Sequence, residues 1–129
     1  MHEERLYPGL GRLIDAAKAV AARVDPTLGR TEVVALLTAI GAVYAAPAGE
    51  DQRGCPVSAA EAALASARAA GDCEVSTAAV TLANDVSESV SPSLATCLAL
   101  AELDPELPMV VKQLGRWVVV PLSRLWPSV

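Results

Sequence analysis

The segment from residue 31 to residue 46 constrains the fold of this chain more than any other feature of its sequence. It is almost entirely apolar, and its apolar residues surround the whole circumference of a helical projection. A helix of this kind is normally buried, because no face of it is suited to water. Thr31 is a favourable helix N-cap and Pro47 is a strong helix terminator. The pattern therefore predicts a buried central helix over residues 31–46.

Four other segments carry the apolar periodicity or the end signals of helices that would pack around this centre. The first follows Pro8, a favoured first-turn residue, and the second opens with the capping box formed by Ser58 and Glu61. The other two show short apolar stripes at three- and four-residue spacing. The predicted helices cover residues 8–24, 58–70, 76–90 and 92–103.

These segments predict an all-α fold, a compact bundle of five to six helices in a single domain over residues 1–129. The composition agrees, because alanine is the commonest residue and is also the best helix former. Residues 47–57 are rich in Pro and Gly and carry mixed charge, which indicates an exposed loop. A pocket beside Tyr44 and this loop is the candidate ligand site.

The C-terminal tail, residues 107–129, differs from the rest in charge. Residues 1–106 hold 15 acidic and seven basic residues (7 − 15 = −8), whereas the tail holds three basic residues and no acid (+3). It contains both tryptophans, and we predict a helix over 108–114 followed by an extended arm. Trp and Arg often carry interface energy. The candidate interface residues are Arg116, Trp117, Val119, Leu122, Arg124, Leu125 and Trp126.

Three alternatives for the tail stay open at this point. It folds back and its tryptophans fill the alanine-rich core, it contacts another protein subunit or a second copy of the chain, or it lies on an anionic membrane surface. Three basic residues are few for the membrane alternative.

The residue inventory excludes several kinds of chemistry. The single histidine, His2, lies near the N-terminus, where an active-site imidazole is not expected. The three cysteines do not form a disulfide framework or a spaced metal-ligand set. We therefore expect no catalytic residues, no cofactor and no metal ion. The net charge of −5 also argues against general nucleic-acid binding.

Residues Leu82–Ser93 resemble a helix-turn-helix DNA reader, with an alanine in the first helix and a Val-Ser-Pro-Ser turn before the second. The resemblance implies DNA binding by the following segment, Leu94–Leu98. That segment contains no Arg, Lys, Asn or Gln for base edges.

The sequence favours a non-enzymatic interaction or assembly protein, forming a homo-oligomer or a subunit of a larger complex. One alternative is a small helical ligand-binding protein or enzyme using the Tyr44 pocket, and a second is a helix-turn-helix transcriptional regulator. The N-terminus lacks the apolar region of a signal peptide, and the longest apolar run is shorter than the roughly 20 residues needed to span a bilayer. We therefore expect a cytoplasmic protein without a transmembrane segment.

Overall fold

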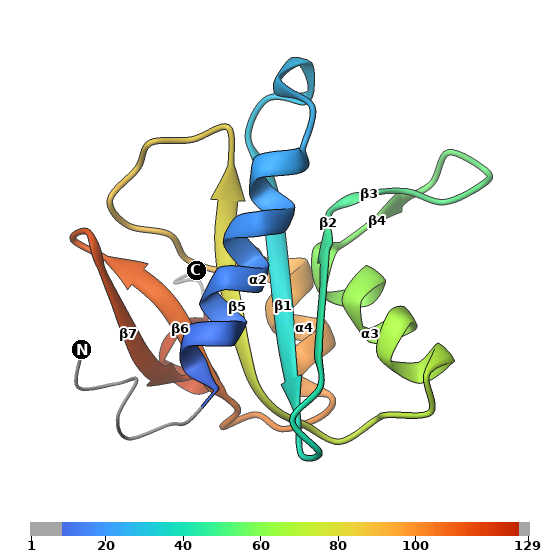
Figure 1. Cartoon of the computed structure of the whole chain (residues 1–129), viewed down its shortest axis with the longest axis vertical. Coiled ribbons are helices and arrows are strands. Elements are labelled where there is room, and N and C mark those ends of the chain that lie inside the picture. The colour runs from blue at the N-terminus through green and yellow to red at the C-terminus, as the bar shows by residue number, and fades with distance from the viewer. Residues whose placement is uncertain (1–8, 127–129) are drawn as a thin grey trace.

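The computed structural model describes residues 9–126 and shows an α/β protein (Figure 1). The predicted all-α bundle is therefore wrong. With η denoting a short 3₁₀ helix, the elements in chain order are α2 (Leu10–Arg23), η1 (Pro26–Leu28), β1 (Thr31–Thr38), β2 (Val43–Pro47), β3 (Gly49–Glu50), β4 (Pro56–Val57), α3 (Ala59–Ala69), β5 (Val75–Ala83), α4 (Leu94–Ala101), β6 (Pro108–Gln113), β7 (Arg116–Pro121) and η2 (Leu122–Arg124).

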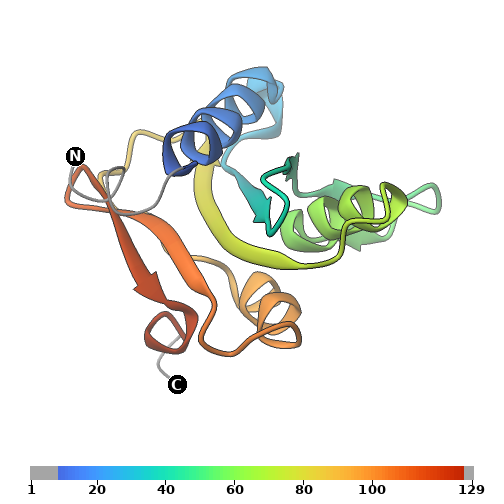
Figure 2. The same ribbon diagram turned by 60° about the horizontal axis from the view of Figure 1, so that its bottom comes forward.

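The main sheet has the strand order β2-β1-β5-β6-β7. Neighbouring strands are antiparallel except β5 and β6, which run parallel and are connected through α4. The helix α2 packs on one face of this sheet, whereas α3 and α4 pack on the other. Figure 2 shows α2 and α4 on opposite sides of the curved sheet. The molecule is thus a three-layer α/β/α arrangement.

The predicted central helix over residues 31–46 is instead a β-hairpin made by β1 and β2. Gly41 adopts a left-handed φ of 86° at its turn, and the Thr38 N–H donates to the Ala42 carbonyl at 2.9 Å. Strand β1 is buried on both faces, so its sequence has no polar alternation. A buried strand and a buried helix then look alike by periodicity alone. Ile40, which the helix would have buried, is 80% exposed at the hairpin tip.

Two other predicted helices are also strands, for the same reason. The segment predicted as a helix over 76–90 contains β5, which lies between β1 and β6 at the centre of the sheet. The segment 108–114 forms β6. Helices cover both faces of the sheet, so neither strand shows a polar side. The extended arm predicted for the tail is confirmed, because Arg116–Pro121 forms the edge strand β7.

Three predicted helices are confirmed by α2, α3 and α4. The start proposed for the first helix, Pro8, lies outside the described residues, as does His2. At α3, the Ser58 hydroxyl accepts from the Glu61 N–H at 3.1 Å, as the capping box requires. The Glu61 carboxylate accepts from the Ser58 hydroxyl rather than from its backbone N–H. The predicted loop 47–57 contains the short hairpin of β3 and β4.

Residues of β1 alternate between two apolar cores. Val34 and Leu36 pack with α3 and α4, whereas Ala35 and Leu37 pack against α2. Because side chains along a strand alternate between faces, even-numbered residues of β1 point toward α3 and α4. Glu32, which has the same parity, therefore also points toward the side of α3 and α4. Within the described residues, no helix is both long and apolar enough to cross a membrane.

Candidate functional site

Tyr44 does not line either of the two best-formed clefts of the described residues. Its hydroxyl donates to the Asp72 carboxylate at 3.3 Å, and the Thr38 hydroxyl donates to the same oxygen at 2.7 Å. Desolvation, and then the charge of Asp72, raises the pKa of the Tyr44 phenol. These contacts tie β2 to the segment that follows α3, so they give Tyr44 a structural task.

The candidate interface residues of the tail separate into buried and exposed groups. Leu122 is fully buried in the core shared with α3 and α4, and Leu125 packs against that core. Trp117 and Val119 are half-buried against the α2 side of the sheet, with the Lys18 ammonium 5.9 Å from the Trp117 ring centre. The remaining three, Arg116, Arg124 and Trp126, are exposed.

The tail is therefore part of the sheet and its core, as the first of the three alternatives proposed. The tryptophans do not fill that core, because Trp117 is half-buried and Trp126 is 38% exposed. A contact between the exposed tail residues and a second copy or another subunit stays a prediction.

The segment that resembles a helix-turn-helix does not contain its first helix. Leu82 and Ala83 end strand β5, and residues 84–93 form no helix. Only the second helix exists, as α4. The transcriptional alternative therefore loses the geometry on which it depended.

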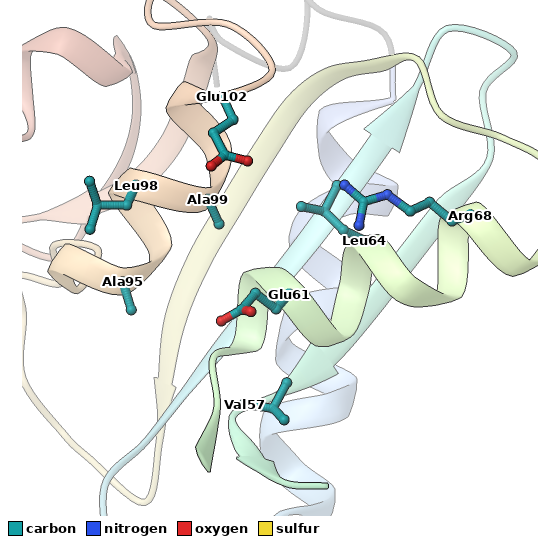
Figure 3. Close-up of a pocket in the computed structure, with 8 residues that line it drawn as sticks. All are labelled: Val57, Glu61, Leu64, Arg68, Ala95, Leu98, Ala99 and Glu102. Carbon is teal, nitrogen blue, oxygen red and sulfur yellow. The ribbon is translucent and has the colours of Figure 1, made fainter. Parts of the chain in front are cut away.

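A cleft with a volume of about 580 Å³ lies between α3 and α4. Apolar and polar surface contribute almost equally to its walls, and Glu61, Arg68 and Glu102 supply its charged groups. Figure 3 shows Glu61 and Ala95, from the first turns of the two helices, at one end of the cleft, and Arg68 and Glu102 at the other. The remaining lining residues are Val57, Leu64, Leu98 and Ala99. Sites for small ligands commonly have this size.

A second polar feature, the Glu32 network, lies at the first turn of α4. It consists of Glu32, Ser93 and Thr96. Glu32 has the same parity as Val34, so its side chain leaves β1 toward α4. Its Oε2 accepts from the Ser93 N–H at 2.8 Å, and its Oε1 accepts from the Ser93 and Thr96 hydroxyls at 3.0 and 2.7 Å. A carboxylate here also interacts favourably with the dipole of α4.

Ser93 has a second role in this network, because it is also the N-cap of α4. Its hydroxyl accepts from the Thr96 N–H at 3.2 Å while it donates to Glu32. Thr96 is fully buried, so its hydroxyl needs the acceptor that Glu32 provides. The network satisfies the first turn of α4 and joins it to β1.

The buried Cys97 follows Thr96 on α4. Burial, and then the negative charge of Glu32, raises the pKa of its thiol. A protonated thiol is a poor nucleophile and a poor metal ligand. Among residues 9–126, no three His, Cys, Asp or Glu side chains gather closely enough to hold a metal ion.

The sequence did not reveal either feature as a site. The cleft needs α3 and α4 to lie side by side, and the Glu32 network joins residues 61 and 64 positions apart in the chain. One signal was available, since Ser58 and Ser93 are both N-cap residues that begin helices of the same face. The helix predicted over 92–103 placed Ser93 inside its first turn, so the capping role of Ser93 was not recognised.

Solved structures of cytidine deaminases share this fold. The one from Burkholderia pseudomallei is 28% identical, covers 91% of this chain and 95% of its own, and has a TM-score of 0.72. The one from Mycobacterium leprae is 20% identical, covers 92% and 98%, and has a TM-score of 0.68. The one from Mycobacterium tuberculosis is 18% identical, covers 92% and 94%, and has a TM-score of 0.69.

No protein-family model and no curated protein matches the sequence. The structural neighbours overturn the predicted role of a non-enzymatic interaction or assembly protein, because proteins of this fold include enzymes. The helical fold of the predicted ligand-binding protein or enzyme is corrected as well, since the chain is built on a five-stranded sheet. A ligand at Tyr44 stays a prediction.

Proposed function

We propose that this chain binds a pyrimidine nucleoside of the cytidine class in the cleft between α3 and α4. The observation that carries the proposal is the likeness to a cytidine deaminase over 91% of this chain and 95% of the other. The cleft adds a physical reason, because its volume of about 580 Å³ suits a small ligand. Cytoplasmic residence belongs to the same proposal, since the exposed, unpaired Cys55 and Cys73 suit a reducing compartment.

The charged groups of the cleft complement the edge of a cytosine ring. Cytosine presents an exocyclic amine, which donates, beside a ring nitrogen and a carbonyl, which accept. Carboxylates accept from such an amine, and a guanidinium donates to adjacent acceptors through its fork of N–H groups. Glu61, Arg68 and Glu102 supply both kinds of group around one cleft. Apolar walls from Leu64 and Leu98 provide surface on which a ring can pack.

Isothermal titration calorimetry with cytidine tests this proposal. Arg68→Ala is expected to weaken cytidine binding by roughly 10-fold or more, because it removes the only guanidinium of the cleft. Arg23→Ala is the matched control, since Arg23 is also an exposed arginine in the last turn of a helix, on the opposite face of the sheet. It is expected to leave the affinity unchanged.

Uridine provides a second comparison, because a carbonyl replaces the exocyclic amine and cannot donate to a carboxylate. We expect uridine to bind more weakly than cytidine. Absence of cytidine binding to the unmodified chain at millimolar concentration would overturn the proposal. Equal losses in Arg68→Ala and Arg23→Ala would remove the assignment to this cleft.

A further inference from the structure

Zinc-dependent nucleobase deaminases provide a chemical comparison for the first turns of α3 and α4. They hold the metal with one His or Cys from an H-x-E type motif and two Cys from a P-C-x-x-C motif, and the Glu acts as the acid–base group. In this chain, residues 92–96 read Pro-Ser-Leu-Ala-Thr. They have the proline and the spacing of the second motif, with Ser93 and Thr96 at the two cysteine positions.

The first motif fails at the start of α3 in either possible register. If Ser58, the N-cap of α3, holds the ligand position as Ser93 does at α4, the acid–base position falls on Ala60. If Glu61 is instead the acid–base residue, the ligand position falls on Ala59. Neither register supplies a His or a Cys. The residues present therefore do not fit zinc, which requires thiolate, imidazole or carboxylate donors rather than serine and threonine hydroxyls.

The three cysteines do not restore the donor set. Cys55 precedes Ser58 by three residues and lies in the exposed turn between β3 and β4. Cys97 is one residue beyond Thr96, which rotates it by about 100° around α4. It lies in the core cluster, with its sulfur 4.0 Å from the Leu125 carbonyl. Cys73 is exposed in the connection between α3 and β5.

We infer that the Glu32 carboxylate replaces a metal ion at the first turn of α4, so that this corner of the fold is held by hydrogen bonds and binds no zinc. The Ser93 and Thr96 side chains, at the two cysteine positions, both donate to Glu32. Each hydroxyl that a metal would have to recruit is thus already bonded to an internal anion. This inference concerns the start of α4 and goes beyond nucleoside binding, on which it does not depend.

The network also accounts for how the corner is stable without a metal. Three donors surround one carboxylate, so both of its oxygens are bonded. Hydrogen bonds to charged groups contribute more than neutral ones, and unsatisfied donors left by removing the acceptor are costly. A structural zinc site would instead make folding depend on the metal. The chain is therefore expected to fold to the same stability with or without zinc.

Thermal unfolding and metal analysis of four proteins test the inference. These are the unmodified chain, Glu32→Ala, Glu32→Gln and the control Glu50→Ala, in which an exposed strand glutamate is truncated. The unmodified chain is expected to carry well below one zinc per chain, and its Tm is expected to be insensitive to a chelator. Glu32→Ala should lower the Tm by roughly 5–10 °C, and Glu32→Gln by less, because one carbonyl oxygen still accepts. Glu50→Ala should leave it nearly unchanged.

Cysteine substitutions test whether this corner is equivalent to the zinc site of the nucleobase deaminases. Two quadruple variants cover the two registers: Ser93→Cys, Thr96→Cys and Glu32→Val are combined with Ser58→Cys in one and with Ala59→Cys in the other. Each supplies three thiols and removes the internal anion, and the variant with the correct register is expected to take up one zinc per chain when folded. Stoichiometric, chelator-sensitive zinc in the unmodified chain would overturn the inference. So would equal Tm losses in Glu32→Ala and Glu50→Ala, or the failure of both folded cysteine variants to take up zinc.

Discussion

The first turn of α4 and the cleft beside it are polar features on the same face of the sheet, yet their polar groups are satisfied differently. At the first turn, the Glu32 carboxylate accepts three hydrogen bonds from within the chain. In the cleft, Glu61 accepts only from the Ser58 hydroxyl, and Arg68 is exposed. Groups that are fully bonded internally hold the fold, whereas exposed charged groups around a cleft remain free for a ligand. This difference separates a stabilising region from the region that we propose for ligand recognition.

The largest effect is expected inside the Glu32 network. Thr96→Val keeps the shape of a fully buried side chain but removes its hydroxyl, so the unfolding free energy should fall by about 2 kcal/mol. Urea denaturation measures this loss. In a double-mutant cycle with Glu32→Gln, we expect a coupling energy of about 1 kcal/mol. Simple additivity would mean that the two side chains do not interact.

A substitution in the cleft should lower ligand affinity more than it lowers stability. Ala95→Trp places a large side chain between α3 and α4, so cytidine affinity should fall by roughly 10-fold, about 1.4 kcal/mol, with a much smaller change in stability. Ala65→Trp is the control, because Ala65 is exposed on α3 but does not line the cleft. Calorimetry and urea denaturation of both variants separate the two effects. If Ala95→Trp lowered the stability without lowering the cytidine affinity, the contrast between a stabilising network and a ligand-binding cleft would be contradicted.

Ser58 combines a stabilising contact with a contact to a cleft residue, because it caps α3 and also bonds the Glu61 carboxylate. Ser58→Ala should cost about 1 kcal/mol of stability through the lost N-cap. It should also free Glu61 and change cytidine affinity by a smaller factor than Ala95→Trp does. A variant that is destabilised but binds cytidine as the unmodified chain does would show that Glu61 takes no part in recognition.

The smallest expected effect is the pH response of Cys97. Burial, and then Glu32, raises the pKa of its thiol, so the folded chain holds the proton more strongly than the unfolded chain. The resulting stability is present below the ordinary thiol pKa and is lost as the pH rises through the folded value. Urea denaturation at increasing alkaline pH should show this decline, and Cys97→Ala should reduce it. An unchanged slope would exclude the thiol as its source.

Reactivity toward a thiol reagent at pH 8 tests whether the Cys97 thiol is inaccessible in the folded protein. Cys55 and Cys73 are exposed and should react in the native protein, whereas Cys97 should react only after unfolding. Rapid modification of all three thiols would show that the first turn of α4 opens readily.

The helices that could be predicted from the sequence are those with local signals. The helix α2 has an apolar stripe with a polar opposite face, and α3 has the Ser58 cap followed by alanines. The strands β1 and β5 could not be predicted in the same way, because helices cover both faces of the sheet and remove the polar alternation. Val33 and Val34 are β-branched, but their apolar run is as compatible with a buried helix as with a strand.

The candidate site depended on contacts that local patterns do not encode. Glu32 meets Ser93 and Thr96 only because β1 lies beside β5 and α4 crosses back over the sheet. The prediction of an extended segment at Arg116–Pro121 succeeded because a β-prone run is followed by a proline, which is a local signal. Elements with local sequence signals could therefore be predicted, whereas the pairing of distant segments could not.

Native mass spectrometry of the unmodified chain, purified from cells grown with added zinc, tests most directly whether Glu32 stands in place of a metal. Comparison of the native and denatured masses reports any ion that is retained by the fold. The Glu32 network predicts that the folded chain has the mass of the polypeptide alone. A native mass higher by one zinc ion per chain, lost on denaturation, would contradict it.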